Sequence, residues 1–347
     1  MKIKYSDLLK YIEKIFVEYK LSKVHAKISA KYLVDADFSG VPTHGIARVS
    51  MYCMRIKKKL INSKPKIKIK KISPSIFHID ADNSIGMVAA DIATDLLIEH
   101  TKKNGIVLVG VKNSGHYGMS GLFAEKAAKK GLAIWCYTNA PPFIPPHGTT
   151  KPLFGTNPIC FACPTNNIDE PFVLDMSTSS TNRGKLQYAL KIGKKLEPGM
   201  AFDKNGNPTL DPIKALNGGM IAPIATYKGS GLAWMIDIIS GVMTGANHSG
   251  KVKDPYNDLS GPQNVGHMFI AFKADIFLGN NYKKRIKENI VTVKKLPKKR
   301  NLLKVCYPGE SKSKIKLKNK KNGIIVDPKI LEDLNKTAQA VGLTIKI

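Results

Sequence analysis

The chain contains the apolar run Ile106-Val107-Leu108-Val109-Gly110-Val111, followed shortly by Ser114-Gly115-His116-Tyr117-Gly118. The run is short and rich in β-branched residues, which predicts a buried strand. The residues from Leu122 to Lys130, with Gly131 behind them, predict a helix closed by a glycine. His116 is therefore expected in a strand-to-helix turn, where functional loops concentrate. Imidazole titrates near neutrality, so His116 is a candidate acid–base residue, with a capping or core-edge histidine as the alternative.

A second group of polar side chains follows Pro42. Thr43 is expected to cap a helix on which His44, Arg48 and Tyr52 recur at every fourth position and so share one face. A guanidinium matches a carboxylate with two parallel hydrogen bonds, and imidazole and phenol can bond to a hydroxyl or carbonyl beside it. The group predicts a cradle for a 2-hydroxy or 2-oxo acid. The alternative is an ordinary amphipathic helix with a solvated polar face.

Arginine is rare in this chain. Only five of its 55 basic residues are arginine, and the formal net charge is +29. Where lysine is the default cation, an arginine is expected to have a task that lysine cannot perform. The charge raises the question of nucleic acid or anionic membranes, but we find no nucleic-acid module and no zinc-finger spacing. We interpret the lysines as a surface bias and expect no specific nucleic-acid partner.

Length and composition indicate a globular protein. With 347 residues, 43% of them hydrophobic, the chain has room for two domains and a sizeable core. No apolar run is long enough to span a bilayer, and residues 1–7 lack the core of a signal peptide, so we expect a cytoplasmic protein without membrane contact. The five cysteines are scattered. Cys160 and Cys163 lie in an apolar run, so we expect them in a buried strand and expect no metal site.

Helical patterns occupy both ends of the chain. Apolar residues keep helical spacing after Ser6 and again after Ser22, and Asp327 with Pro328 predicts the start of a last helix. Lysine and isoleucine alternate from Lys66 to Lys70, which predicts a strand leading into a new domain. We therefore predict a helical domain formed by residues 1–72 and 275–347, around an α/β domain of residues 73–274.

Several common motifs are absent from the sequence. It contains no G-x-G-x-x-G, so the usual doubly wound dinucleotide site is not expected. It also lacks G-x-x-x-x-G-K-[ST], H-E-x-x-H and G-x-S-x-G, which disfavours phosphate-loop and hydrolase readings. Glycine-rich loops remain that could hold a nucleotide by backbone contacts.

With these features, the chain resembles the malate/L-lactate dehydrogenase type 2 family, which includes ureidoglycolate dehydrogenase, sulfolactate dehydrogenase, diketogulonate reductase and piperideine-carboxylate reductase. The motifs that carry the resemblance are Thr43-His44-Gly45 with Arg48 and Tyr52, Ser114 to Gly118, Phe154 to Pro158, Leu174 to Ser179 with Gly184-Lys185, Asp203 to Thr209 with Asp211-Pro212, Tyr227-Lys228-Gly229 and Tyr307-Pro308-Gly309. The resemblance implies an α+β, non-Rossmann fold. In it, a helical domain from both termini flanks an inserted, largely antiparallel cofactor-binding domain. It also implies a homodimer whose active site lies between domains or subunits.

The resemblance also implies roles for individual residues. His116 would accept the hydroxyl proton of a small carboxylate substrate while a hydride passes to the nicotinamide of NAD or NADP. His44, Arg48 and Tyr52 would orient the substrate, His44 as a second catalytic residue. Asn157 is a substrate-binding candidate, with stabilisation of its own turn as the alternative. The cofactor-binding candidates implied by the family pattern are Asn139, Asp175, Met176, Ser177 and Lys228.

Two loops depart from the family pattern. His147 to Thr150 and Ala225-Thr226 stand where relatives carry glycines, and His147 is an extra candidate for substrate contact. We predict an NAD(P)-dependent oxidoreductase that interconverts a small 2-hydroxy acid and its 2-oxo acid, with malate and oxaloacetate first. The alternatives are ureidoglycolate oxidation, suggested by the run Pro255 to Leu259, and cyclic imino acid reduction. A non-catalytic polyanion-binding protein on an inactive scaffold is the alternative from another class. The sequence leaves NAD and NADP open.

Overall fold

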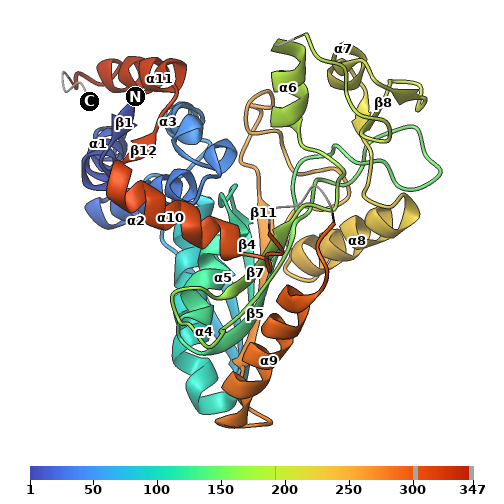
Figure 1. The fold of residues 1–347 in the computed structure, drawn as a ribbon. Helices are drawn as coiled ribbons and strands as arrows, with labels where there is room; N and C mark the ends of the chain where they lie inside the picture. Colours follow the sequence, from blue (N-terminus) through green and yellow to red (C-terminus); the bar gives the residue numbers. More distant parts are fainter. Residues whose placement is uncertain (192, 300–303, 344–347) are drawn as a thin grey trace.

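The computed structural model describes residues 1–191, 193–299 and 304–343, and a seven-stranded sheet lies at its centre (Figure 1). In spatial order the strands are β2 (Lys68–Ser73), β3 (Ile76–Asp80), β4 (Ile106–Ser114), β11 (Val265–Lys273), β5 (Leu132–Thr138), β6 (Ile159–Cys163) and β7 (Phe172–Met176). Only β3 and β4 run parallel in this sheet, joined by helix α4 (Gly86–Asn104); every other neighbouring pair is antiparallel. The predicted mixed, largely antiparallel sheet is confirmed.

The strand and helix predicted around His116 are both present. Strand β4 runs through the apolar run to Ser114, and helix α5 (Ser120–Ala128) ends shortly before Gly131. Cys160 and Cys163 lie buried in β6, as expected. Alternation along the strands divides the core between two faces. Phe269 of β11 packs in the large core with α4 and α5, whereas its neighbour Met268 packs with helix α8 (Tyr227–Asp237) on the other face.

The two ends of the chain pack together at one end of the sheet. This helical group contains α1 (Tyr5–Glu18), α2 (Lys23–Phe38), α3 (Val49–Lys57), α10 (Glu310–Asn322) and α11 (Pro328–Gln339). Strand β1 (Lys2–Ile3) pairs with β12 (Ile324–Ile325), and the Tyr11 hydroxyl donates to Asn335 Oδ1 at 2.6 Å. Asp327 caps α11, as predicted, and Ser22 caps α2, the helix expected after it.

Helix α9 (Asn281–Lys295) lies away from that group. It begins at the opposite end of the sheet, where the Tyr282 hydroxyl donates to the carbonyl of Pro164, and runs up beside the strands (Figure 1). The division at residues 72 and 275 stays a prediction. Residues 300–303 and 344–347, within the predicted helical domain, lie outside the described residues.

A small lobe that the sequence analysis did not separate stands beside the helical group (Figure 1). It consists of α6 (Arg183–Lys191), β8 (Ala201–Phe202), β9 (Pro208–Thr209), α7 (Pro212–Leu216) and β10 (Met220–Ile221). Its three short strands form a separate antiparallel sheet, and Leu186, Leu196 and Ala215 contribute to its own core. The lobe places the start of α6 near Thr43, since a Cβ on Gly184 would lie 3.8 Å from the Thr43 methyl group.

Strand β2 forms one edge of the central sheet and is exposed along almost its entire length. Lysines occupy three of its six positions, Lys68, Lys70 and Lys71. Among the described residues, no helix combines the length and the apolar character needed to cross a bilayer.

Candidate active site

His116 occupies the turn between β4 and α5, and two neighbours hold its backbone. Gln263 Oε1 accepts a hydrogen bond from the His116 amide at 3.2 Å. The first turn of α4 packs directly on the same loop, because a Cβ on Gly86 would lie 2.1 Å from the carbonyl oxygen of Gly115. Only glycine permits this approach. The catalytic candidate is thus carried by a turn that is fixed on both sides.

The single helix predicted for residues 43–52 is wrong. Two short 3₁₀ turns, η1 (Pro42–His44) and η2 (Ile46–Arg48), precede α3, and Thr43 caps no helix. The cause is Asp37 of α2, whose Oδ2 accepts the Ile46 amide at 2.7 Å. Gly45 packs against the same carboxylate, since a Cβ there would lie 1.8 Å from Asp37 Oδ2. The break turns His44 and Arg48 away from one helical face.

The four substrate and acid–base candidates nevertheless meet. The Tyr52 hydroxyl lies 2.6 Å from His116 Nδ1 and 3.3 Å from the His116 carbonyl oxygen. The rings of His44 and His116 stack with centroids 6.0 Å apart. Arg48 donates through Nε to the Thr43 carbonyl at 2.8 Å and through one terminal nitrogen to the Tyr256 hydroxyl at 2.7 Å. Residues from two distant segments thus form one constellation.

The electrostatics of this group favour neutral imidazoles. Burial, together with the charge of Arg48 and the neighbouring His44 and His267, holds the pKa of His116 well below its usual value. Burial, with the charges of Arg48 and Lys312, lowers the pKa of His44 to about 4. Burial also raises the pKa of Tyr52, so its hydroxyl stays protonated. The site therefore presents a neutral base beside a guanidinium.

Arg48 has no carboxylate partner in the part of the chain that the structure describes. Its two protein acceptors are a carbonyl and a phenol, both neutral. The nearby Asp254 is paired instead with Arg183 at 2.9 Å. An arginine without a counter-ion beside a neutral histidine is suited to a carboxylate ligand.

A buried histidine braces the strands beneath the site. His267 of β11 lies between β4 and β5, with Nε2 2.7 Å from Ser114 Oγ and Nδ1 2.8 Å from Thr138 Oγ1. Burial lowers its pKa to about 3, so the ring stays neutral. Its face stacks on Tyr117 at 4.5 Å. Because Ser114 and Thr138 end the strands that lead to His116 and Asn139, His267 fixes the spacing between these two loops.

A small pocket of about 80 Å³ opens beside His116. Its lining combines polar groups with apolar walls, and the residues are His44, His116, Tyr117, Gly118, Thr138, Asn139, Ala140, Pro141, Thr156, Pro158, Pro255, Gln263 and Val265. The prolines and Val265 contribute apolar atoms to the lining, and the two histidines contribute polar ones. This combination suits a planar ring with one polar side, such as nicotinamide.

Asn139 and Asn157 are both buried near this pocket. The Asn139 amide donates to the Asn247 carbonyl at 2.6 Å and accepts from the Gly266 amide at 3.0 Å. The Asn157 amide accepts from the Ala140 amide at 3.0 Å and donates to the Ala233 carbonyl at 2.8 Å. The contacts of Asn157 favour its alternative role as a turn-stabilising residue, and substrate contact by Asn157 stays a prediction.

The other cofactor candidates lie at the end of β7, just after it, and in the first turn of α8. Asp175 Oδ2 accepts the Gly121 amide at the start of α5 at 2.8 Å, and burial raises its pKa. Met176 ends β7, and the hydroxyl of the next residue, Ser177, donates to the Ser179 carbonyl at 3.1 Å. Lys228 is exposed in the first turn of α8. Of these residues, the exposed cation Lys228 is suited to a phosphate of a dinucleotide.

The two loops that depart from the family pattern line a common pocket of about 490 Å³. Its lining includes His147, Thr149 and Thr150 from one loop and Thr226 from the other. Ala225 and Thr226 both have left-handed backbone conformations, with φ of +46° and +56°. For a β-branched residue such as Thr226 this conformation is strained.

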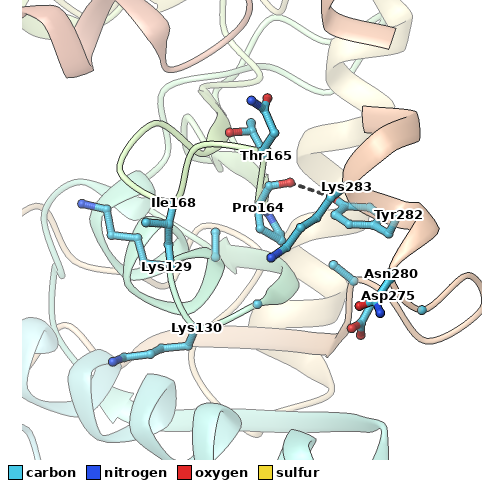
Figure 2. A pocket seen from close by; sticks show the side chains of 14 residues that line it. Lys129, Lys130, Pro164, Thr165, Ile168, Asp275, Asn280, Tyr282 and Lys283 are labelled. Carbon is cyan, nitrogen blue, oxygen red and sulfur yellow. Dashed lines mark hydrogen bonds between the residues drawn. The ribbon is translucent and has the colours of Figure 1, made fainter. Parts of the chain in front are cut away.

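Another pocket, of about 380 Å³, lies at the far end of the sheet (Figure 2). Lys129, Lys130 and Lys283 surround it with Asp275 and Tyr282, and none of the predicted site residues lines it. Its lysines are typical of this chain's surface. Among residues 1–191, 193–299 and 304–343, no group of three or more His, Cys, Asp or Glu side chains is arranged to hold a metal ion.

Sequence reasoning missed Tyr256, Gln263 and His267 as parts of the site. Tyr256 reaches Arg48 across 208 positions of sequence, and Gln263 reaches His116 across 147. No spacing rule connects such distant positions. The sequence pointed to this loop only through the run Pro255 to Leu259, which resembles ureidoglycolate dehydrogenase.

Comparisons with known proteins find similar sequences and a similar fold along almost the whole chain. A family model described as malate/L-lactate dehydrogenase matches residues 3–335. A malate dehydrogenase from Pyrococcus abyssi is 33% identical over 99% of this chain and 96% of its own length. A malate/(S)-sulfolactate dehydrogenase from Methanothermus fervidus is 35% identical over 96% of both. The solved sulfolactate dehydrogenase from Methanocaldococcus jannaschii superimposes with a TM-score of 0.91 at 34% identity, covering 99% of this chain and 98% of that one.

Proposed function

We propose that malate and oxaloacetate are the substrate pair of this chain. The premise is that the chain belongs to the malate/L-lactate dehydrogenase family and is an NAD(P)-dependent 2-hydroxy acid dehydrogenase. The observation that carries the proposal is the unneutralised Arg48 beside the neutral His116. The names of the malate dehydrogenase relatives support the choice of malate.

His116 acts as the proton acceptor in oxidation. Its Nδ1 bonds to the Tyr52 hydroxyl, and that hydroxyl also lies within reach of the His116 carbonyl as a donor. This pairing is satisfied when Nδ1 carries the hydrogen and Tyr52 donates to the carbonyl. Nε2 is then left with a lone pair for the substrate hydroxyl. In reduction the same nitrogen returns the proton.

Arg48 binds the substrate carboxylate and so places the hydroxyl-bearing carbon beside His116. His44, stacked on His116, borders the pocket with a second neutral imidazole. Both imidazoles stay uncharged at neutral pH, so the guanidinium of Arg48 is the cation that attracts the acid.

The bound nicotinamide cofactor supplies the hydride acceptor for oxidation and the hydride donor for reduction. We propose that Asn139, Asp175, Met176, Ser177 and Lys228 hold it. Lys228 offers an exposed cation for a phosphate, and the apolar walls of the pocket exclude water from the ring. Whether NAD or NADP is preferred is decided by the assay below.

Two other substrates are specific alternatives. The run Pro255 to Leu259, which suggested ureidoglycolate, lies at the site through Pro255 and Tyr256. Cyclic imino acid reduction requires a proton donor at the same place, which His116 also provides. A non-catalytic polyanion-binding role does not account for the contacts that bring Tyr52, His44 and His116 together.

The assay that tests the proposal follows the absorbance of NADH and NADPH with purified protein. The acceptors are oxaloacetate, pyruvate, sulfopyruvate and a cyclic imino acid, with ureidoglycolate and NAD in the oxidative direction. We expect the highest kcat/KM with oxaloacetate. A higher value with another acceptor would replace malate, and no turnover with a folded protein would reject the proposed activity.

We also infer a homodimer, which the family resemblance implies. The outer side of α8 and the following turn η3 (Ile238–Val242) exposes an apolar row formed by Trp234, Ile238, Val242 and Met243. Residues 229–250 contain no lysine or arginine. Two copies that each carry a charge of +29 repel one another, so an exposed apolar row in a segment without lysine or arginine is suited to contact with a second copy.

A further inference from the structure

One loop joins the two functional sides of the site. Its first part carries Tyr256, whose hydroxyl accepts a hydrogen bond from Arg48 at 2.7 Å and whose ring lies 5.4 Å from the guanidinium carbon. Its last residue, Gln263, accepts from the His116 amide and donates to the Lys253 carbonyl at 3.0 Å. The loop Lys253–Gln263 therefore contacts both the carboxylate-binding arginine and the proton acceptor.

Arg55 holds this loop from below. Its side chain is fully buried, and its two terminal nitrogens donate to the carbonyls of Pro255, Asp258 and Gly261 at 3.3, 3.1 and 3.0 Å. A planar guanidinium can serve three carbonyls at once, which an ammonium on a flexible stem does less well. The position of Tyr256 is thus set by the protein core.

Asp254 fixes the backbone on the other side of Tyr256. One carboxylate oxygen accepts the amides of Tyr256 and Asn257 at 2.8 and 2.9 Å, and the other pairs with Arg183 of α6. The loop is therefore anchored to the helical group through Arg55 and to the small lobe through Arg183. Such anchoring preorganises a binding residue before its ligand arrives.

The directions of the hydrogen bonds leave one donor on Tyr256 and one on Arg48 without an acceptor in the described chain. Because the Tyr256 oxygen accepts from Arg48, its own proton must point elsewhere, and no acceptor for it lies among the described residues. Arg48 uses Nε and one terminal nitrogen on the protein, and its other terminal nitrogen bonds to nothing in the described chain. The hydrogen-bonded pair of Arg48 and Tyr256 thus retains two donors, one on each side chain, that have no acceptor in the described chain.

We propose that Tyr256 is a substrate-binding residue that donates a hydrogen bond to the carboxylate held by Arg48. This inference rests on the proposed function, since it assumes a 2-hydroxy or 2-oxo acid as the ligand. The carboxylate then receives hydrogen bonds from both the phenol and the guanidinium. The loop Lys253–Gln263 links this carboxylate-binding pair to His116, because Gln263 of the same loop accepts the His116 amide.

The test compares wild type with Tyr256→Phe, which removes the hydroxyl and keeps the ring. A hydrogen bond to a charged group is worth enough that its loss raises KM for the preferred 2-oxo acid about tenfold. We expect kcat to change less than about threefold and KM for the reduced cofactor to stay unchanged. The matched control is Tyr282→Phe, which removes a phenol bonded to the Pro164 carbonyl at the far end of the sheet.

A binding measurement separates this inference from the proposed function. Oxalate, a dicarboxylate that cannot be reduced, is titrated calorimetrically into each protein in the presence of NADH or NADPH. We expect Tyr256→Phe to weaken oxalate about tenfold and Tyr282→Phe to leave it unchanged. Equal oxalate affinity and equal KM in wild type and Tyr256→Phe would overturn the inference, as would a wild type that binds no oxalate. Oxalate binding without turnover of any acid would reject only the proposed activity.

Discussion

The Tyr52 hydroxyl lies 2.6 Å from Nδ1 of His116, although the two residues come from segments 64 positions apart. In the proposed arrangement Tyr52 donates to the His116 carbonyl, Nδ1 carries the imidazole hydrogen, and Nε2 is left for the substrate. Tyr52 is itself buried with a raised pKa, so it does not ionise and does not compete for that proton at working pH.

His116→Ala should lower kcat by about 100-fold to 10,000-fold, because it removes the general base and leaves only binding and orientation. Circular dichroism and thermal unfolding should remain close to wild type, since His116 lies in a turn. His25→Ala on α2 is the control and should leave kcat unchanged. A His116→Ala protein with normal turnover would show that the proton is taken by another group.

The pH dependence of the reaction should reflect the lowered pKa of His116. Oxidation requires neutral His116, and a lowered pKa keeps the ring neutral to lower pH than in an ordinary histidine. The acid limb of kcat/KM for oxidation should therefore fall below about pH 6.5, the ordinary histidine value. Reduction requires the protonated ring, so its kcat/KM should rise as pH falls. An acid limb of kcat/KM for oxidation above pH 6.5 would contradict the assignment of His116 as a base that stays neutral.

Arg48 contributes to that low pKa through its positive charge. Arg48→Gln should therefore move the acid limb of oxidation to higher pH, and it should also raise KM for the acid more than tenfold. Arg48→Lys keeps the charge but loses the planar fork, so it should raise KM while leaving the limb near its wild-type position. If the acid limb of oxidation lies at the same pH in wild type and Arg48→Gln, Arg48 does not contribute to the low pKa of His116.

Thr226→Gly should stabilise the protein. Thr226 has φ of +56° and ψ of −116°, a conformation that costs about 1–3 kcal/mol for a residue with a side chain. Glycine relieves this strain but adds about 0.5–1 kcal/mol of backbone entropy cost, so a net gain of about 1 kcal/mol is expected. Thermal unfolding measures it. Thr150→Gly, at a position without positive φ, should instead lower Tm.

If the protein forms the proposed dimer, Trp234→Lys combined with Val242→Lys should convert it to a monomer, because the change places two cations in the apolar row on α8 and η3. Size-exclusion chromatography with light scattering gives the mass directly. Phe277→Lys is the control, since Phe277 is 90% exposed in the turn before α9, outside that row. A wild-type monomer, or a double variant that stays dimeric, would refute this interface.

The sequence was sufficient for the parts of the fold that depend on local pattern. The strand before His116, the helix after Ser22 and the cap at Asp327 were predicted because neighbouring residues determine them. The helix through His44 was not, because Asp37 breaks it from a different helix. The small lobe escaped notice because its strands have only two residues each, too few to show alternation.

The same distinction holds within the site. His44, His116, Arg48 and Tyr52 stood out because they form two compact motifs, and the structure brings those motifs together. Tyr256 and Gln263 act from a loop whose position is set by the buried Arg55. Contacts of this kind depend on the assembled fold, and no spacing in one sequence reveals them.

Strand β2 has a consequence for how this protein behaves at high concentration. An exposed sheet edge is a template on which other chains can add strands and grow into aggregates. Here the edge carries Lys68, Lys70 and Lys71, so an incoming copy of the same strand would bring three cations against three. The lysine bias of this chain thus acts as a barrier to fibre formation at an open edge of its central sheet.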